Sequence, residues 1–372
     1  MRRFLSGIVA SGIVVFVGII GHPGSAVADG EGTISGKVYV HSYVDATADS
    51  TITKRTAIDL TRAYLGYKYK INDNFLTSLT LDVERVNEIT AVVIDTLKIR
   101  DTIVVGRDTV VSVNLVPKQS KKTVKDERYE VFLKTAFLEW KGLIPTTTLT
   151  LGMIGGIQFD VQEKFWGYRY VYKSFMDEYK MGQSADLGIV AKIKAIDLLQ
   201  INVSVTQGEG FKKPQDINGI FKPGLGVQID PVKGLTAYLY GDYMMVETAG
   251  SDSASIITLA GFVGYEIKDK FKIGAEYNYQ MNQGGYDSCD VSGVSGYGNY
   301  TLVKEFEIFA RADAFMSANN WNLAATGVGI VGGVQYSPHK SVKLAADYQG
   351  FIPDLATAIS KHKIFLNVEF SL

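Results

Sequence analysis

The chain has 372 residues, 46% of them hydrophobic, and a formal net charge of −1 at pH 7. The near-neutral charge gives no reason to expect a nucleic-acid partner, and the single cysteine excludes an intramolecular disulfide framework. The 21 Tyr, 18 Phe and 38 Gly, against only 8 Pro, favour a large β protein over a helical one.

The N-terminus has the three parts of a secretory signal peptide. Arg2 and Arg3 precede the apolar run FLSGIVASGIVVFVGIIG, and Ala26–Ala28 offers a small-x-small cleavage site. We predict a cleaved signal peptide over residues 1–28 and a single mature domain over residues 29–372. A retained membrane anchor is the alternative, because the apolar run is about long enough to span a bilayer.

Sixteen segments of the mature chain alternate apolar and polar residues with the two-residue period of a β-strand. In LQINVSV, for example, the apolar face runs from Leu199 to Val205, and Gln200, Asn202 and Ser204 lie between its members. The connections alternate strictly between short, turn-rich links and long ones. The segments begin near residues 33, 57, 75, 129, 147, 184, 198, 224, 235, 255, 271, 292, 304, 326, 341 and 362.

An even number of strands joined alternately by short and long links is typical of an up-and-down β-barrel. We therefore predict an all-β fold: a 16-stranded antiparallel transmembrane barrel whose last strand, KIFLNVEFSL, pairs with the first, around residues 34–44, so that neither has a free edge. Sixteen strands enclose a lumen too wide for side chains to fill. The polar faces should therefore line water and the apolar faces should contact lipid, in the outer membrane of a Gram-negative bacterium, with periplasmic turns and extracellular loops.

The alternation assigns charged residues of both signs to the lumen wall. A charged selectivity ring needs one sign to dominate, and neither does, so we expect weak charge selectivity. The predicted pore-wall residues are Arg62, Asp82, Glu84, Lys192, Lys272, Glu276, Glu305, Glu307, Arg311, Asp313, Lys343 and Asp347.

The second long link, residues 86–128, alternates over residues 92–116 and predicts a hairpin that rises beyond the membrane. The basic run KQSKK at 118–122 reads either as a solvated tip or as an attachment to lipopolysaccharide phosphates.

The third long link, residues 155–183, is rich in Tyr, Phe and Trp and carries charges of both signs. A loop that folds into the lumen must pack against the wall, whereas an external loop has no need of so many aromatic residues. We predict that this loop folds inward and narrows the pore; an ordinary external loop is the alternative. The residues expected at the constriction are Asp160, Glu163, Lys164, Arg169, Lys173, Asp177 and Glu178.

Motifs for catalysis or cofactor binding are weak. GVGIVG at 327–332 spells the dinucleotide fingerprint, but the strand pattern continues through it. GQSAD at 182–186 narrowly misses the nucleophile elbow, and His41, His339 and His362 are isolated. No Cys/His cluster has transition-metal spacing. The sequence therefore predicts no enzyme, no cofactor and no metal.

Two stretches resemble a known family. RAYLGYKYKINDNFLTSLTLDVE (62–84) is similar to the second and third strands of outer-membrane porins related to the phosphate-selective porin family. EKFWGYRYVYKSFMDEYKMGQSADLG (163–188) resembles the constriction loop and following strand of such porins. The resemblance implies sixteen strands, a homotrimer, an inward third loop and passive diffusion of small solutes.

The leading hypothesis is a porin, a water-filled channel for small hydrophilic solutes or ions that selects by size and by the transverse field of its loop charges. One alternative is a plugged barrel that serves as a surface scaffold or adhesin through its long loops. Another is an outer-membrane hydrolase, since catalytic triads assemble in space rather than in sequence.

Overall fold

The computed structural model describes residues 30–85, 88–105, 108–125, 128–215, 219–246 and 253–372. The predicted signal peptide, residues 1–28, lies outside the described residues. Within the described ranges, no helix is both long and apolar enough to cross a membrane.

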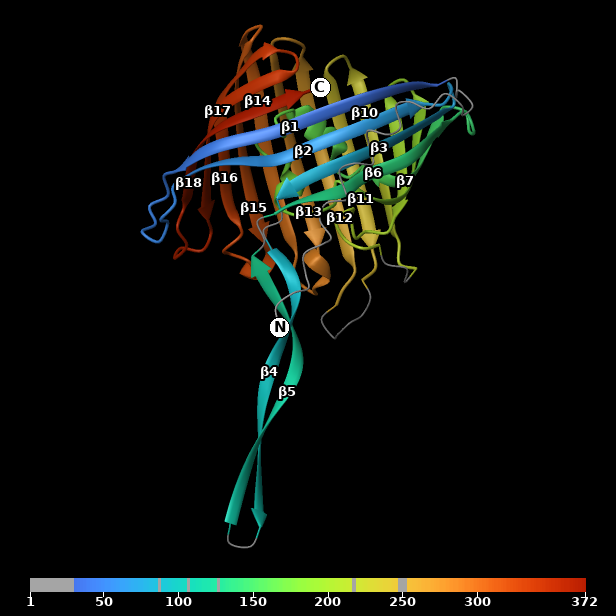
Figure 1. Ribbon diagram of the computed structural model, residues 1–372. Coiled ribbons are helices and arrows are strands. Elements are labelled where there is room, and N and C mark those ends of the chain that lie inside the picture. The colour runs from blue at the N-terminus through green and yellow to red at the C-terminus, as the bar shows by residue number, and fades with distance from the viewer. Residues whose placement is uncertain (1–29, 86–87, 106–107, 126–127, 216–218, 247–252) are drawn as a thin grey trace, which may run out of the picture.

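Sixteen antiparallel strands close into one barrel (Figure 1), as the sequence predicts. Each strand begins within two residues of its predicted start. Short turns gather at one end, the upper end in Figure 1, and long links at the other. The barrel strands are β1 (Glu31–Asp45), β2 (Thr56–Lys70), β3 (Phe75–Arg85), β6 (Tyr129–Lys141), β7 (Thr147–Gly155), β8 (Ala185–Ile196), β9 (Leu199–Thr206), β10 (Lys222–Val232), β11 (Leu235–Met244), β12 (Ile256–Ile267), β13 (Phe271–Met281), β14 (Val291–Val303), β15 (Phe306–Ser317), β16 (Gly327–His339), β17 (Val342–Pro353) and β18 (Lys361–Ser371).

The terminal strands close the barrel by pairing with each other. β1 pairs with β18 from Lys37, opposite Ser371, to Asp45, opposite Lys363, and it pairs with β2 on its other side. Closure satisfies the backbone hydrogen bonds of both edge strands, which an open sheet would leave unpaired.

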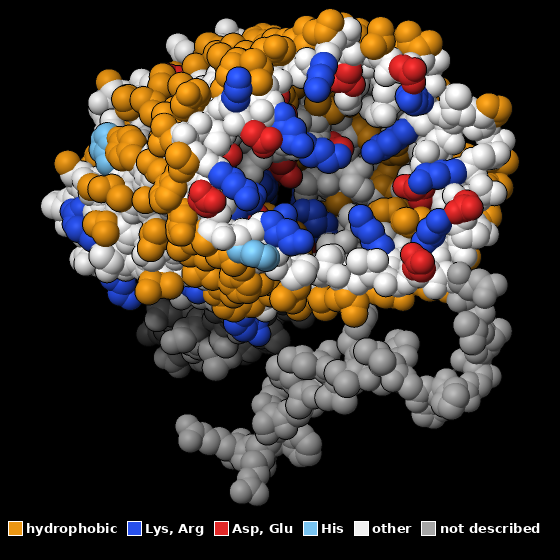
Figure 2. All heavy atoms as spheres, turned by 90° about the horizontal axis from the view of Figure 1, so that it is seen from above, with side chains coloured by type: hydrophobic (Ala, Val, Ile, Leu, Met, Phe, Trp, Pro, Cys, Tyr) orange, Lys and Arg blue, Asp and Glu red, His pale blue; other side chains and the backbone are white. Residues whose placement is uncertain are grey.

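Alternating side chains give the barrel two chemically different faces. In β13, Ile273 and Tyr277 are exposed on the outer face, whereas Glu276 and Asn278 are buried inside. Figure 2 views the barrel from its short-turn end, where apolar side chains form a band around the outside and charged side chains surround a hollow. An apolar outer band and a polar interior are typical of a transmembrane barrel with an aqueous lumen.

The second long link contains the predicted hairpin. β4 (Glu88–Val105) and β5 (Asp108–Lys125) pair along their whole length as a separate two-stranded sheet. The hairpin extends away from the long-link end of the barrel (Figure 1). The run at 118–122 lies within β5, paired with residues 91–95, and not at the tip. The interpretation of this run as a tip is therefore wrong, because the ladder of β4 and β5 continues beyond it to the pair Val105–Asp108.

The hydrophobic core lies inside the barrel, between its wall and the third long link. This link carries two short helices, α1 (Asp160–Trp166) and α2 (Phe175–Glu178). Trp166, Phe175 and Met176 from these helices are almost fully buried. Two further long links carry the short 3-10 helices η1 (Gln283–Gly285) and η2 (Ala318–Asn320).

Candidate pore constriction

The third long link, residues 156–184 and hereafter the inner loop, turns sharply after its first helix. α1 ends at Trp166, and the next residue, Gly167, has a φ of 77° and donates its N–H to the Glu163 carbonyl. Glycine adopts this left-handed conformation without steric cost. The turn sends Tyr168, Arg169 and Tyr170 along the barrel interior instead of continuing the helix.

Tyrosine hydroxyl groups tie the loop to the wall. The Tyr168 hydroxyl donates to Glu307 Oε2 at 2.7 Å, and the Tyr170 hydroxyl donates to Gln335 Oε1 at 2.8 Å. Burial raises the pKa of Tyr168, with Glu307 adding to the effect, so this phenol remains a hydrogen-bond donor at neutral pH.

Wall side chains also bind backbone carbonyl groups of the loop. Tyr238 in β11 donates to the Ile157 carbonyl at 2.6 Å, and Gln280 in β13 donates to the Met181 carbonyl at 2.8 Å. These contacts fasten both ends of the inner loop, so its path across the lumen is fixed at several points.

Arg311 in β15 is the central anchor. Its guanidinium donates to both carboxylate oxygens of Asp313 at 2.8 Å and to the Lys173 carbonyl at 2.7 Å. It also lies 5.4 Å from the ring centroid of Trp166 and 5.3 Å from that of Tyr172. A buried charge of this kind needs a good partner and further hydrogen bonds. Arg311 has a bidentate carboxylate partner, one carbonyl acceptor and two aromatic rings beside its guanidinium.

Several predicted pore-wall residues therefore lie under the inner loop. Glu276, Arg311, Asp313 and Asp347 point inward but are buried. Glu307 accepts the Tyr168 hydroxyl. On this covered side, formed by β11–β17, Glu307 and Arg311 bind the loop directly. Glu276 and Asp347 instead accept hydrogen bonds from the wall residues Asn278 and Asn367.

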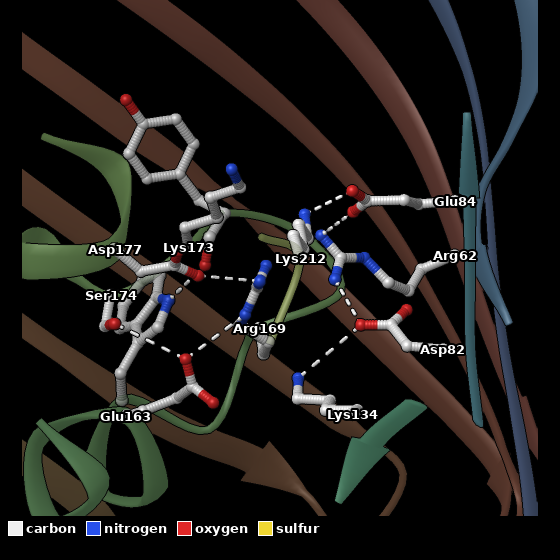
Figure 3. A network of polar contacts seen from close by, with 12 residues as sticks. Arg62, Asp82, Glu84, Lys134, Glu163, Arg169, Lys173, Ser174, Asp177 and Lys212 are labelled. Atoms are coloured by element: carbon white, nitrogen blue, oxygen red, sulfur yellow. Dashed lines mark hydrogen bonds and ion pairs between the residues drawn. The ribbon is translucent and has the colours of Figure 1, made fainter. Parts of the chain in front are cut away.

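The inner loop presents a cluster of charges to the opposite side of the lumen, away from the covered wall. Arg169 contacts Glu163 at 3.2 Å and Asp177 at 2.7 Å. Burial disfavours the charge on Arg169, but Asp177, Tyr64 and Glu163 outweigh burial and raise its pKa. Figure 3 shows Arg169 between the loop carboxylates that it contacts and the wall residues Arg62 and Asp82.

The facing wall carries a second cluster, on the open side formed by β1–β3, β6 and β18. Arg62 contacts Asp82 at 2.7 Å and Glu84 at 2.6 Å. Lys134 lies 3.8 Å from Asp82, and Lys212 forms an ion pair with Glu84. Three cations thus share two carboxylates (Figure 3).

Two β-bulges adjoin this wall cluster. Tyr39 pairs with Arg62 and Val40 with Leu60, which leaves Thr61 as the extra residue of β2. Lys134 is the corresponding extra residue of β6, opposite Thr80 and Leu81 of β3. A bulge changes which residues of a strand face inward. The bulge at Thr61 therefore lets Asp59 and Arg62 both border the outer chamber, despite their odd spacing.

A string of cavities passes between the two clusters. An outer vestibule of about 840 Å³ at the long-link end shares Tyr172 and Glu178 with an outer chamber of about 380 Å³. That chamber shares Tyr39 and Arg169 with an inner chamber of about 500 Å³ nearer the short turns. Lys164 joins the inner chamber to a side chamber of about 440 Å³. Tyr39 and Arg169 line both chambers and therefore mark the boundary between them.

The other predicted site residues border these chambers or lie at the barrel end. Lys173 and Glu178 line the outer chamber, and Lys343 lines the inner one. Further residues line the side chamber: Asp160, Lys164, Lys192 and Lys272. Asp160 pairs with Lys164 at 2.7 Å. Glu305 is exposed in the short turn before β15.

Sequence reasoning missed several charged residues of the open side. Lys37, Lys134 and Glu369 all line the inner chamber. The two-residue period of their strands could have found Lys37 and Glu369, whereas Lys134 lies at a bulge, where this period breaks. Lys212 has no such signal, because it belongs to the long link between β9 and β10.

The link that carries Lys212 is held by one carboxylate. Asp186 accepts the backbone N–H groups of Gly208 at 2.5 Å and Gly210 at 3.2 Å. This contact positions Phe211 and Lys212 at the wall cluster. In the part of the chain that the structure describes, no three His, Cys, Asp or Glu side chains group as metal ligands.

Comparison with known proteins gives likeness in structure only. No protein-family model matches the chain, and no curated protein does. Among solved structures, Salmonella typhi OmpF matches 92% of this chain and 97% of its own, with a TM-score of 0.62 and 12% identity. The outer membrane channel DcaP of Acinetobacter baumannii matches 93% and 99%, with a TM-score of 0.58 and 11% identity. A mutant of the Rh. blastica porin matches 92% and 100%, with a TM-score of 0.52 and 12% identity.

The chain has the porin fold. At these identities the likeness extends to the barrel architecture and not to individual residues. The charges around Arg169 must therefore be interpreted from this chain's own geometry.

Proposed function

We propose that the protein is an outer-membrane porin that lets small hydrophilic solutes and ions diffuse passively. The observation that carries this proposal is the string of cavities that runs from the outer vestibule, past Arg169, to the inner chamber. The lining of this route is largely polar and charged, and water is its natural filling.

Selection by such a channel requires a narrow point and a field across it. The boundary that Tyr39 and Arg169 mark between the two chambers is the proposed narrow point. On the loop side, Glu163 and Asp177 outnumber Arg169 by one charge; on the wall side, the three cations outnumber Asp82 and Glu84 by one. Opposite net charges across a confined passage set up a transverse field, which acts on dipolar solutes more strongly than in open water.

The proposal includes the protein's surroundings. Export by the signal peptide would deliver the chain to the outer membrane, where its apolar outer band would contact lipid and its long-link end would meet lipopolysaccharide. A homotrimer is the proposed assembly; the similar structure of Vibrio cholerae OmpT is described as a trimer form. Passive diffusion needs no catalytic residue, so we propose no enzymatic activity.

Single-channel recording in a planar lipid bilayer tests this function. Stable conductance steps from folded protein are expected, because neighbouring chambers along the proposed route share lining residues. Folded protein that inserts and gives no steps would overturn the channel proposal, and would favour a plugged barrel acting as a surface scaffold through its long loops.

A further inference from the structure

We propose that the channel prefers anions, because the carboxylates on the open side are buried behind the cations that they bind. This inference rests on the proposed channel function and adds the sign of its charge selectivity. The solute class is small, negatively charged and hydrated.

The clearest case is the trio of Lys37, Lys343 and Glu369 in the inner chamber. Glu369 in β18 lies 3.8 Å from Lys37 and 3.3 Å from Lys343. The Glu369 side chain is 10% exposed, whereas Lys37 and Lys343 are 44% and 31% exposed. One carboxylate is thus shared by two cations, and the cations face the chamber.

The wall cluster repeats this arrangement at the constriction. Asp82 is 0% exposed, while its partner Lys134 is 19% exposed. Glu84 is 14% exposed, while its partner Lys212 is 39% exposed. Arg62, at 12%, is about as exposed as Glu84, so the exposed positive charge of this cluster comes from the ammonium groups of Lys134 and Lys212.

The chambers carry the same imbalance as a whole. Five basic and two acidic side chains line the inner chamber, and the two acids are Glu163 and Glu369. Four basic and three acidic side chains line the outer chamber. Figure 2, taken from the short-turn end, shows Lys and Arg side chains gathered around the hollow.

Burial explains why the sequence predicts no dominant sign. Of the seven acids assigned to the pore wall, four are buried: Asp82, Glu276, Asp313 and Asp347. Of the five basic residues assigned to the pore wall, only Arg311 is buried. Similar numbers of the two signs therefore leave an excess of positive charge at the water-filled surface.

Rising salt concentration should weaken the anion preference, because salt screens the charges that line the chambers. The Debye length is about 10 Å at 0.1 M ionic strength and about 3 Å at 1 M. Charges that border chambers of a few hundred Å³ act across the passage at the lower salt concentration and are largely screened at the higher one. An anion preference from these residues must therefore fall as salt rises.

The reversal potential under a KCl gradient measures the preference directly, because K⁺ and Cl⁻ have similar mobilities in water. At about 0.1 M salt, we expect a reversal potential whose sign shows that chloride is more permeable than potassium. Near 1 M the reversal potential should be smaller. In the double variant Lys37→Gln/Lys343→Gln, the chloride-to-potassium permeability ratio should fall at least about twofold. In Lys37→Glu/Lys343→Glu it should invert. Lys304→Gln, in an exposed short turn, is the matched control and should leave the ratio unchanged.

The outcomes separate this inference from the channel function. If the unmodified protein gives conductance steps but a reversal potential of the sign for cation preference, the anion preference is overturned and the channel function stands. An unchanged ratio in both double variants would overturn the assignment to this trio. A complete absence of steps would contradict the channel function itself. The salt series needs no variant, so the inference stays testable even where a variant does not fold.

Discussion

The covered and open sides of the barrel share the same alternation of inward and outward side chains, but their inward side chains have different roles. On the covered side, inward polar groups such as Glu307, Gln335 and Arg311 bind the inner loop. The ion pair of Arg311 with Asp313 is buried there. On the open side, inward charges bind one another, and their cations stay partly exposed. The inner loop thus makes the difference, because it converts part of a polar lumen wall into a packing surface and narrows the space left for solutes.

Removing the loop should have the largest effect on this division. Deletion of residues 160–180 takes away both helices and most of the anchors, so the covered side becomes accessible to water. We expect single-channel conductance to rise severalfold. A conductance equal to that of the full chain would mean that the loop does not narrow the pore.

Removing the central anchor should have the next largest effect. Arg311→Met leaves the Asp313 carboxylate buried without its partner, and breaking a buried ion pair in this way costs about 3–5 kcal/mol. We expect a lower unfolding temperature and noisier channel currents, because the loop loses its hold at the Lys173 carbonyl.

Two controls sharpen the Arg311 result. The double variant Arg311→Met/Asp313→Leu removes both charges and should recover part of the lost stability, since an apolar pair avoids the unpaired carboxylate. Lys134→Met, on the open side, should change the unfolding temperature much less. Equal destabilisation by Arg311→Met and Lys134→Met would erase the distinction between the two sides.

A change in the loop charge should alter selectivity more than stability. Arg169→Gln removes a partly exposed cation and leaves Glu163 and Asp177 unpaired at the constriction. The chloride-to-potassium permeability ratio should fall, as measured by the reversal potential. An unchanged ratio, with folding intact, would mean that ions pass elsewhere.

The smallest effect is expected from Lys212→Gln. Partly exposed ion pairs such as Lys212–Glu84 contribute about 0–1 kcal/mol, so the unfolding temperature should hardly change. The permeability ratio should shift slightly toward cations, because Glu84 keeps only Arg62 as its partner. A loss of stability as large as that of Arg311→Met would contradict the open-side description.

The barrel is predictable from sequence because its evidence is local. A two-residue period and alternating link lengths locate all sixteen strands, including the pairing of β18 with β1. The inward positions of Arg62, Asp82 and Glu84 follow from the same alternation.

The constriction is less predictable because it depends on contacts distant in sequence. The bulges at Thr61 and Lys134 follow no residue pattern that marks them. Lys212 reaches Glu84 only because Asp186 folds its link back. The burial of Asp313 and Asp347 depends on where the loop lies, which strand alternation does not encode.

Cysteine modification tests the central claim that the wall under the inner loop is closed to water and solutes. Thr80→Cys lines the inner chamber, whereas Ser295→Cys points inward but is buried on the covered side. Both would be made with Cys289→Ser, so that each protein has one thiol. A charged methanethiosulfonate reagent should rapidly change the conductance of Thr80→Cys and leave Ser295→Cys unaffected. Equally fast modification of Ser295→Cys would contradict the account, because water would then have free access to the covered side.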